Sequence, residues 1–275
     1  MSAPGTPSAH GPVIGVFDSG FGGLTVLRAL LPRIPGAHYL YVGDTARLPY
    51  GAKSQATIAR YAVESARLLE QRGAEYLVIA CNTATALALP EIRAAVSIPV
   101  IGVIEPVVQA AQQKHPGGNV LVLATAATVQ SRAYAHACDA HGLHATEKAC
   151  PLLVPLVEEG WIDHPVTQDV LRIYLSEALA DATPQAVLLG CTHYPLIAKQ
   201  ITAMLCSLGS TAEVIDSAEA TAAEVERVVN APKNSTAPAA TFECFATDSV
   251  EKFQRLGSLF LSRPIATVHL LDLGG

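Results

Sequence analysis

The sequence has few charged residues and no cluster of basic ones. Only 15% of its 275 residues are charged, and 18 Lys and Arg against 24 Asp and Glu give a formal net charge of −6. No run of Lys or Arg forms a stripe that could follow a phosphate backbone. We therefore expect no nucleic-acid partner.

Long hydrophobic runs are also missing. No uninterrupted apolar stretch approaches the roughly 18 residues that a membrane-spanning helix needs. The opening segment, MSAPGTPSAHGP, has neither the basic region nor the apolar region of a signal peptide. We expect residues 1–12 to form a disordered tail on a cytoplasmic protein that has no membrane partner.

The cysteines lack the spacing of a metal site. Six of them are present, with no C-x-x-C pair and no Cys/His spacing of the zinc-finger type. The sequence therefore predicts no metal, and a reducing cytosol argues against a disulfide framework. Each cysteine is then either a small buried hydrophobe or a reactive thiol.

Short apolar runs, in contrast, recur along the chain. Segments with helical periodicity separate them, such as residues 54–73, which Ser54 can cap and Gly73 can close, and residues 166–182. Apolar strands that alternate with helices predict parallel sheets covered on both faces, which is the α/β fold class. The expected strands lie in residues 12–18, 38–44, 75–81, 98–105, 119–125, 185–191 and 212–217.

Two of these runs end alike, in VIACNTA and LLGCTHYP, with Cys81 and Cys191 at equivalent places. Each cysteine falls at the carboxyl end of an expected strand, where α/β sheets bind ligands. A helix is expected to follow, and its N-terminus favours a thiolate. A cysteine at such a place is often only a core residue. The matched placement in two similar halves that face each other favours a catalytic pair.

The segment FDSGFGGLTVL joins an expected strand to a helix, and Gly20, Gly22 and Gly23 let backbone N–H groups approach an anion. One interpretation is a dinucleotide site, with Asp44 on the ribose. The third glycine of that motif is missing, however, and Asp18 would repel a pyrophosphate. A small ligand with an ammonium and a carboxylate fits better. The alternative that these glycines only form a turn for tight packing of strand and helix also stays open.

Three further segments carry polar candidates. Thr125 and Thr128 follow another expected strand, as ligands or as helix caps. Pro49, Tyr50 and Gly51 stand in an expected loop, where the preferences of a turn explain the proline and the glycine without any function in binding. The polar stretch NAPKNSTAPAATF, residues 230–242, is predicted to be a linker before a last strand and helix.

Taken in order, GVFDSGFGGLTVL, YVGDTARLPYG, CNTATA, PVIGVIEP and GCTHYPL strongly resemble the glutamate racemases, a group within the aspartate/glutamate racemase family. The resemblance runs from Val13 to about Ala218. It implies a cofactor-independent enzyme that interconverts L- and D-glutamate and supplies D-glutamate for peptidoglycan, and so for the cell wall and cell shape. Glutamate is then the small-molecule partner, and we expect a homodimer.

The resemblance also implies the organisation of the chain and of its site. Two α/β domains related by a pseudo-twofold are expected, the first at 13–103 plus 213–275 and the second at 104–212. Cys81 and Cys191 become the two acid/base groups, Asp18 and His193 assist them, and Glu158 has a supporting part. The implied substrate contacts are Asp18, Ser19, Pro49, Tyr50, Gly51, Asn82, Thr83, Thr125, Thr128, Thr192 and His193.

The chemistry agrees with this assignment, because inverting a stereocentre by proton exchange requires a base on one face and an acid on the other. The pKa of a thiol is near 8.5 when unperturbed, and it must be lowered if the thiol is to act as a base near neutral pH. Two alternatives remain. An aspartate racemase or decarboxylase could share the fold, although His193 favours glutamate. A nucleotide-binding module could use the glycine loop, although it has no need of matched thiols.

Overall fold

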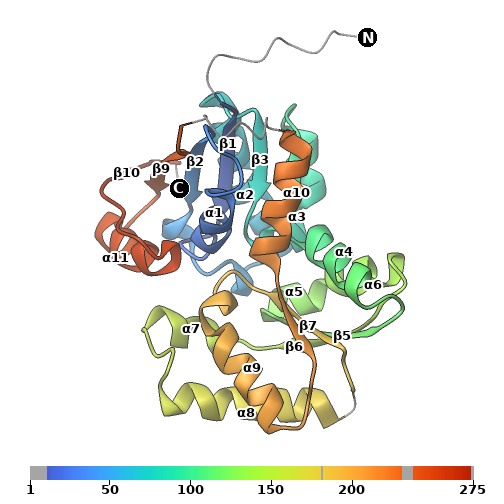
Figure 1. Cartoon of the computed structure of the whole chain (residues 1–275). Coiled ribbons are helices and arrows are strands. Elements are labelled where there is room, and N and C mark those ends of the chain that lie inside the picture. The colour runs from blue at the N-terminus through green and yellow to red at the C-terminus, as the bar shows by residue number, and fades with distance from the viewer. Residues whose placement is uncertain (1–10, 181, 231–237, 274–275) are drawn as a thin grey trace.

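The structure is a computed structural model that describes residues 11–180, 182–230 and 238–273. Two parallel sheets, each with its own helices, lie one above the other (Figure 1). The predicted α/β class is therefore confirmed. All but the last two residues of the expected tail lie outside the described residues, as does most of the predicted linker.

The first domain is built on a six-stranded parallel sheet with the order β10-β9-β2-β1-β3-β4. Side chains alternate across it: Val16 of β1 joins the core beneath α1 and α10, and Phe17 joins the core beneath α2 and α3. Its elements are β1 Val13–Asp18, α1 Leu24–Leu30, β2 His38–Gly43, η1 Thr45–Arg47, η2 Tyr50–Ala52, α2 Gln55–Gln71, β3 Tyr76–Ile79, α3 Asn82–Ala95, β4 Val100–Gly102, α10 Ser217–Val229, β9 Thr241–Ala246, α11 Val250–Leu261 and β10 Val268–Leu270.

The second domain is built on a four-stranded parallel sheet with the order β6-β5-β7-β8. One continuous apolar cluster joins the two domains, since it contains Val16 and Leu24 of the first together with Leu123 and Leu189 of the second. The elements of the second domain are α4 Ile104–Lys114, β5 Asn119–Ala124, α5 Ala126–Ser131, α6 Ala133–Ala140, β6 His144–Ala149, α7 Leu153–Glu158, α8 Pro165–Ala180, β7 Ala186–Gly190, η3 Tyr194–Ile197, α9 Ala198–Ser207 and β8 Glu213–Asp216.

All seven apolar runs of the sequence form strands, and local signals fix several helix ends. The Ser54 hydroxyl accepts a hydrogen bond from the Thr57 N–H at the start of α2, and Gly73 closes the same helix with a φ of +92°. Strand β6 was not predicted. It reads HATEKA and lies at an edge of its sheet, so it lacks the apolar run that marks a buried strand.

The return to the first domain comes slightly later than the predicted residue 213. Strand β8, Glu213–Asp216, pairs with β7 in the second sheet, because Leu188 lies opposite Ile215. Helix α10 follows at once and packs against α1 of the first domain. The crossover therefore lies between Asp216 and Ser217.

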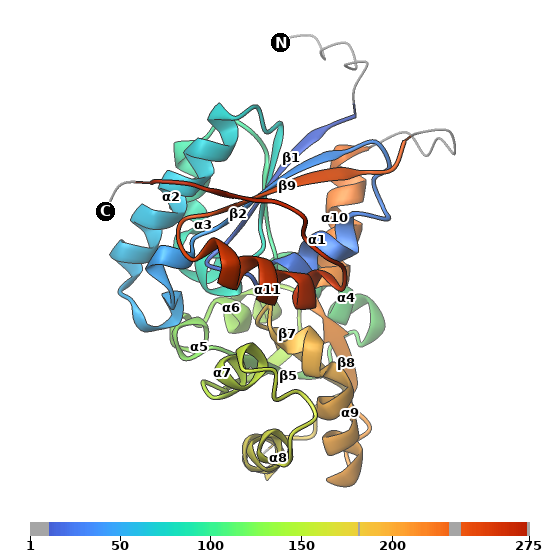
Figure 2. The same cartoon turned by 90° about the vertical axis from the view of Figure 1, so that its left-hand side faces the viewer.

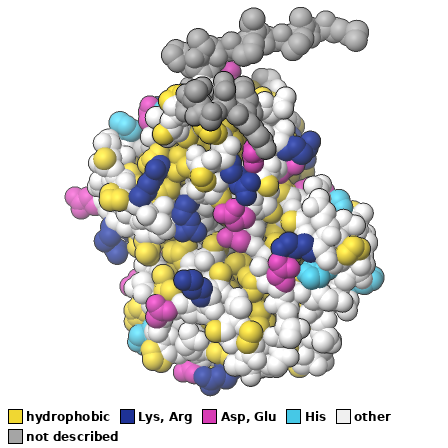
Figure 3. Space-filling view, viewed as in Figure 1, with side chains coloured by type: hydrophobic (Ala, Val, Ile, Leu, Met, Phe, Trp, Pro, Cys, Tyr) yellow, Lys and Arg dark blue, Asp and Glu magenta, His cyan; other side chains and the backbone are white. Residues whose placement is uncertain are grey.

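The surface agrees with the charge balance of the sequence. Basic and acidic side chains are interspersed on the face shown in Figure 3, with no basic stripe across it. None of the helices in the described ranges combines the length and the apolar character that crossing a bilayer requires.

Candidate active site

The two paired cysteines stand at the carboxyl ends of interior strands of their sheets. Cys81 follows β3 and is the N-cap of α3, where its sulfur accepts a hydrogen bond from the Ala84 N–H at 3.4 Å. Cys191 follows β7 and precedes the short 3₁₀ helix η3, not the α-helix that was expected. Each side chain is only 5% exposed. Both thiols are thus held away from bulk water.

The glycine loop of the first domain packs directly on the cysteine segment of the second. A Cβ atom placed on Gly22 would lie 2.2 Å from Thr192 Oγ1 and 2.7 Å from His193 Nδ1. The Thr25 hydroxyl donates to the Thr192 carbonyl at 3.1 Å. Only glycine fits this contact, so the loop has a packing role in addition to any role in binding.

Asp18 ends β1 beneath the glycine loop and is 1% exposed. The Gly20 N–H donates to its Oδ2 at 2.9 Å, whereas Oδ1 has no hydrogen-bond partner within the described ranges. Burial raises the pKa of this carboxyl, and His193 opposes the rise. One carboxylate oxygen is therefore available to a ligand.

Burial also dominates the ionisation of both thiols. It raises the pKa of Cys81 to about 11; the charge of Asp18 adds to the rise, and hydrogen bonding with Ser19 and Ala84 opposes it. Burial raises the pKa of Cys191 well above its usual value, and the charges of Cys81 and Asp18 add to the rise. The expected lowering by a helix N-terminus is present at Cys81 but is outweighed. Each thiol is protonated near neutral pH.

His193 lies beside Cys191 and is 8% exposed. Its Nδ1 is 3.9 Å from Cys191 Sγ and 3.4 Å from Thr192 Oγ1, and its Nε2 is 3.1 Å from Glu158 Oε1. On the other side of the site, the Cys81 thiol donates to Ser19 Oγ at 3.5 Å. The structure thus gives each cysteine a polar neighbour from the predicted set.

Hydroxyl and amide groups of the two domains meet where the domains come together. Thr83 Oγ1 is 3.0 Å from Thr125 Oγ1 and 3.3 Å from Thr128 Oγ1, and the latter two are 2.9 Å apart. The Asn82 Oδ1 accepts from the Tyr134 hydroxyl at 2.6 Å. Its buried Nδ2 meets no hydrogen-bond acceptor among the described residues. That amide N–H group can be donated to a ligand.

The loop of Pro49, Tyr50 and Gly51 meets this rim through its backbone, since a Cβ on Gly51 would lie 3.6 Å from Thr125 Cβ. The Tyr50 side chain is engaged elsewhere, because its hydroxyl donates to Asp44 Oδ2 at 2.6 Å. Asp44 is fully buried, and its other oxygen accepts from a threonine hydroxyl of the β9–α11 loop at 2.9 Å. It cannot hold a ribose, which counts against a dinucleotide site.

In the part of the chain that the structure describes, no three His, Cys, Asp or Glu side chains group closely enough to hold a metal ion.

The sequence did not indicate two residues that lie at the site. Tyr134 holds Asn82, and Phe260 packs against the His193 ring with centroids 4.9 Å apart. Neither stands in a recognisable motif, and each reaches the site from a distant part of the sequence.

The sequence of this chain is similar to known proteins over most of its length. A family model described as Asp/Glu/Hydantoin racemase matches residues 11–225. The glutamate racemase of Koribacter versatilis is 49% identical over 98% of this chain and all of its own length. That of Aquifex pyrophilus is 41% identical over 91% of this chain and 94% of its own.

Solved structures agree. The glutamate racemase from Thermus thermophilus in complex with β-chloro-D-alanine has a TM-score of 0.84 at 42% identity, covering 95% of this chain and 97% of its own. The Francisella tularensis enzyme in complex with D-glutamate has a TM-score of 0.87 at 33% identity, covering 96% and 98%. An aspartate racemase from Picrophilus torridus, 18% identical with a TM-score of 0.60, shares the fold. This chain belongs to the Asp/Glu/hydantoin racemase family.

Proposed function

We propose that this racemase interconverts L- and D-glutamate without a cofactor, by proton transfer between the α-carbon and the thiols of Cys81 and Cys191. The observation that carries the proposal is the placement of these thiols. They stand at the carboxyl ends of interior strands in two facing domains, and the charge of Cys81 contributes to the raised pKa of Cys191. The similarity to proteins named glutamate racemase supports the choice of substrate.

The reaction needs a base on one face of the α-carbon and an acid on the other. When one cysteine is a thiolate it takes the α-proton, and the C–H electron pair passes to the α-carbon and the adjoining carboxylate. The other cysteine, still a thiol, then gives its proton to the opposite face and becomes the thiolate. The enzyme ends with its proton on the first cysteine, ready to run in reverse.

The negative charge that develops during the transfer requires fixed donors, because no cofactor withdraws it. The unpaired Nδ2 of Asn82, which follows Cys81 directly, and the three threonine hydroxyls that meet around Thr83 are the candidates for such donors. The free Oδ1 of Asp18 is suited to the substrate ammonium, and it lies in the same wall as Cys81. We assign His193 to assist Cys191, which lies 3.9 Å from its Nδ1.

The role in the cell follows from this activity. An enzyme that makes D-glutamate supplies a building block of peptidoglycan, and we expect this enzyme to be cytoplasmic. We keep the expectation of a homodimer, which light scattering on the purified protein tests. A binding module is no longer a useful alternative, because it explains neither the matched thiols nor the family.

The direct test follows the optical activity of D-glutamate and of D-aspartate with purified enzyme in deuterated water and no added cofactor. We expect glutamate alone to lose its optical activity while deuterium enters at the α-carbon. Reaction with aspartate alone would move the assignment to the aspartate-specific branch of the fold. No reaction with either acid would refute the proposal.

The thiols are tested by Cys81→Ala and Cys191→Ala, each of which should abolish racemisation. Each variant retains one thiol and should still exchange the α-hydrogen of one enantiomer with solvent deuterium, without inversion. Cys206→Ala is the matched control, because this cysteine is free and exposed on α9. Near-normal turnover in either of the first two variants would contradict the two-thiol mechanism.

A further inference from the structure

The last strand-helix-strand unit, β9, α11 and β10, lies beyond the family match, which ends at residue 225. It nonetheless reaches the site. Helix α11 lies at the junction between the domains, below the edge of the first sheet and next to α7 of the second domain (Figure 2). Contacts from both ends of this helix lead to His193.

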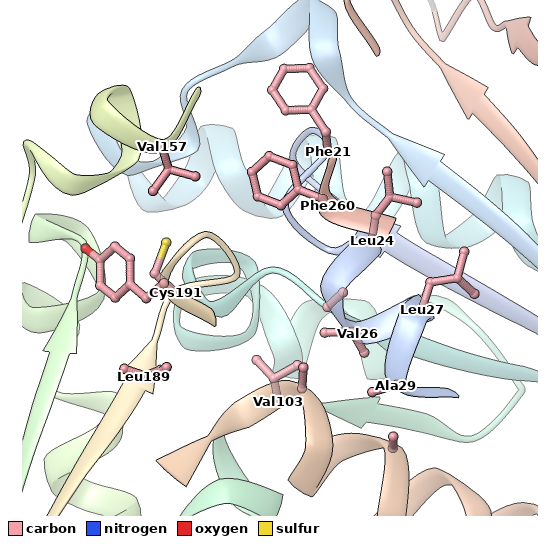
Figure 4. Close-up of a cluster of buried hydrophobic side chains, with 14 of the residues drawn as sticks. Phe21, Leu24, Val26, Leu27, Ala29, Val103, Val157, Leu189, Cys191 and Phe260 are labelled. Atoms are coloured by element: carbon pink, nitrogen blue, oxygen red, sulfur yellow. The ribbon is translucent and has the colours of Figure 1, made fainter. Parts of the chain in front are cut away.

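Phe260, near the end of α11, touches the His193 ring itself. The two rings are 4.9 Å apart between centroids and inclined by 77°, an edge-to-face contact. Phe260 is fully buried, and the centroid of its ring is also 6.4 Å from that of Phe21. Figure 4 shows Phe21, Val157 and Phe260 on the side toward which the Cys191 sulfur points. The ring contact is therefore part of the apolar surroundings of this thiol.

Lys252, near the start of α11, acts on the same histidine through its carboxylate partner. Its Nζ is 3.9 Å from Glu158 Oε2, while Glu158 Oε1 is 3.1 Å from His193 Nε2. The lysine also lies 5.5 Å from the centre of the Phe21 ring, on the glycine loop. Helix α11 of the first domain thus holds α7 of the second from across the junction.

These contacts decide which atom of His193 faces the thiol. A neutral imidazole carries one N–H, and a carboxylate at Nε2 accepts it, so the lone pair is left on Nδ1. Nδ1 is the atom beside Cys191 Sγ, at 3.9 Å. A ring free to tilt would lose this approach, since the donor and acceptor are already near the limit of a sulfur hydrogen bond.

We propose that Phe260 and Lys252 are positioning residues, through which the C-terminal helix α11 holds the His193–Glu158 pair against Cys191. The proposal rests on the proposed function, because it assigns these two residues to the half of the reaction that uses Cys191. Neither residue touches the reacting atoms.

The first test is Phe260→Leu, which keeps an apolar side chain in the core and removes the ring. We expect kcat to fall by about 3- to 10-fold, the factor that corresponds to an aromatic pair contact, with KM changed by less than about 2-fold. Leu259→Ala is the matched control, because Leu259 is the neighbour of Phe260 on α11 and is 40% exposed. It should retain the wild-type kcat.

A second readout separates positioning from general loosening. If only the Cys191 step is slowed, the α-deuterium isotope effect on kcat/KM grows for the enantiomer that Cys191 deprotonates and shrinks for the other. General damage to the fold would not divide the two directions in this way. Equal changes in both directions would therefore overturn the proposal.

The third test does not depend on the core. Lys252 is half exposed, so Lys252→Met should fold normally and lower kcat by about 2-fold at low salt, as expected for a partly exposed ion pair. Lys252→Arg should restore the rate, and Glu251→Gln, an exposed charge on the same helix, should not change it.

Racemisation by the wild-type enzyme is measured first, so that a failure of the proposed function is seen before any variant is compared. Given an active wild type, an unchanged kcat in both Phe260→Leu and Lys252→Met would refute the role of α11. A lower kcat with the divided isotope effect would support it.

Discussion

Asp18→Asn should make this protein more stable and much less active. The wild-type carboxyl is 1% exposed, and one of its oxygens lacks a partner among the described residues. Burial raises its pKa in the folded state. Folding therefore favours the protonated form, and stability is lost as pH rises from the unfolded pKa of about 3.9 through the folded value. An amide at this position carries no charge to bury.

The expected gain follows from the buried charge, because an Asn amide would leave its N–H₂ as unpartnered as the free oxygen is. Each unit by which burial raises the pKa of the folded carboxyl corresponds to about 1.4 kcal/mol of stability lost at high pH. At pH 8 the variant should therefore be more stable by at least about 1 kcal/mol, which corresponds to roughly 2 to 4 °C in Tm. At pH 4, close to the unfolded pKa of about 3.9, little of this loss has occurred, so the difference should be small. The Asn carbonyl can still accept from the Gly20 N–H.

The assay is thermal unfolding of both proteins at pH 4 and pH 8, with racemisation measured in parallel. Asp44→Asn is the matched control, because both oxygens of that buried carboxylate accept hydroxyl protons, from Tyr50 and Thr247. It should be destabilised, since an amide N–H₂ cannot accept. A gain for Asp18→Asn that is the same at both pH values, or no gain at pH 8, would refute the reasoning.

Three further predictions concern packing, hydroxyls and pH. Gly22→Ala puts a Cβ 2.2 Å from Thr192 Oγ1 and 2.7 Å from His193 Nδ1, so racemisation should fall by at least about 10-fold in the circular dichroism assay. Thr128→Val removes a fully buried hydroxyl and should raise KM and lower stability by about 1 kcal/mol in urea unfolding. Cys81 has its pKa raised to about 11, which favours the folded thiol. Between pH 8.5 and 11 the wild type should therefore lose about 2 to 3 kcal/mol relative to Cys81→Ala, measured by denaturant unfolding, with no such trend below pH 8.

The strands were predictable because their side chains are buried on both faces, which requires continuous apolar runs such as VIGVFD and AVLLG. Strand β6 escaped the same rule at a half-exposed edge. The switch of α10 back to the first domain left no local mark on the sequence, because a crossover between domains is decided by which core the helix completes.

Much of the candidate site was predictable in the same way, since Asp18 ends β1, and Cys81 and Cys191 lie within two residues of the ends of β3 and β7. The electrostatic balance was not. The helix N-terminus beside Cys81 is visible in the sequence, whereas the opposing burial depends on the facing domain and on how closely it packs. The Phe260 contact with His193 was also hidden, because it joins residues 67 positions apart.

In the proposed reaction each thiol must ionise in turn, and the raised pKa values give a reason for placing a carboxylate beside both of them. Burial, with the charge of Asp18 adding to its effect, opposes the ionisation of both Cys81 and Cys191, so the enzyme without substrate keeps both thiols protonated. In the proposed reaction the substrate brings an α-ammonium, and the free oxygen of Asp18 is where that cation binds. Its charge then offsets the charge of Asp18, and a thiolate forms more readily only when an amino acid is present. The same carboxylate that lowers the stability of the empty protein thus couples the activation of the thiols to the arrival of substrate.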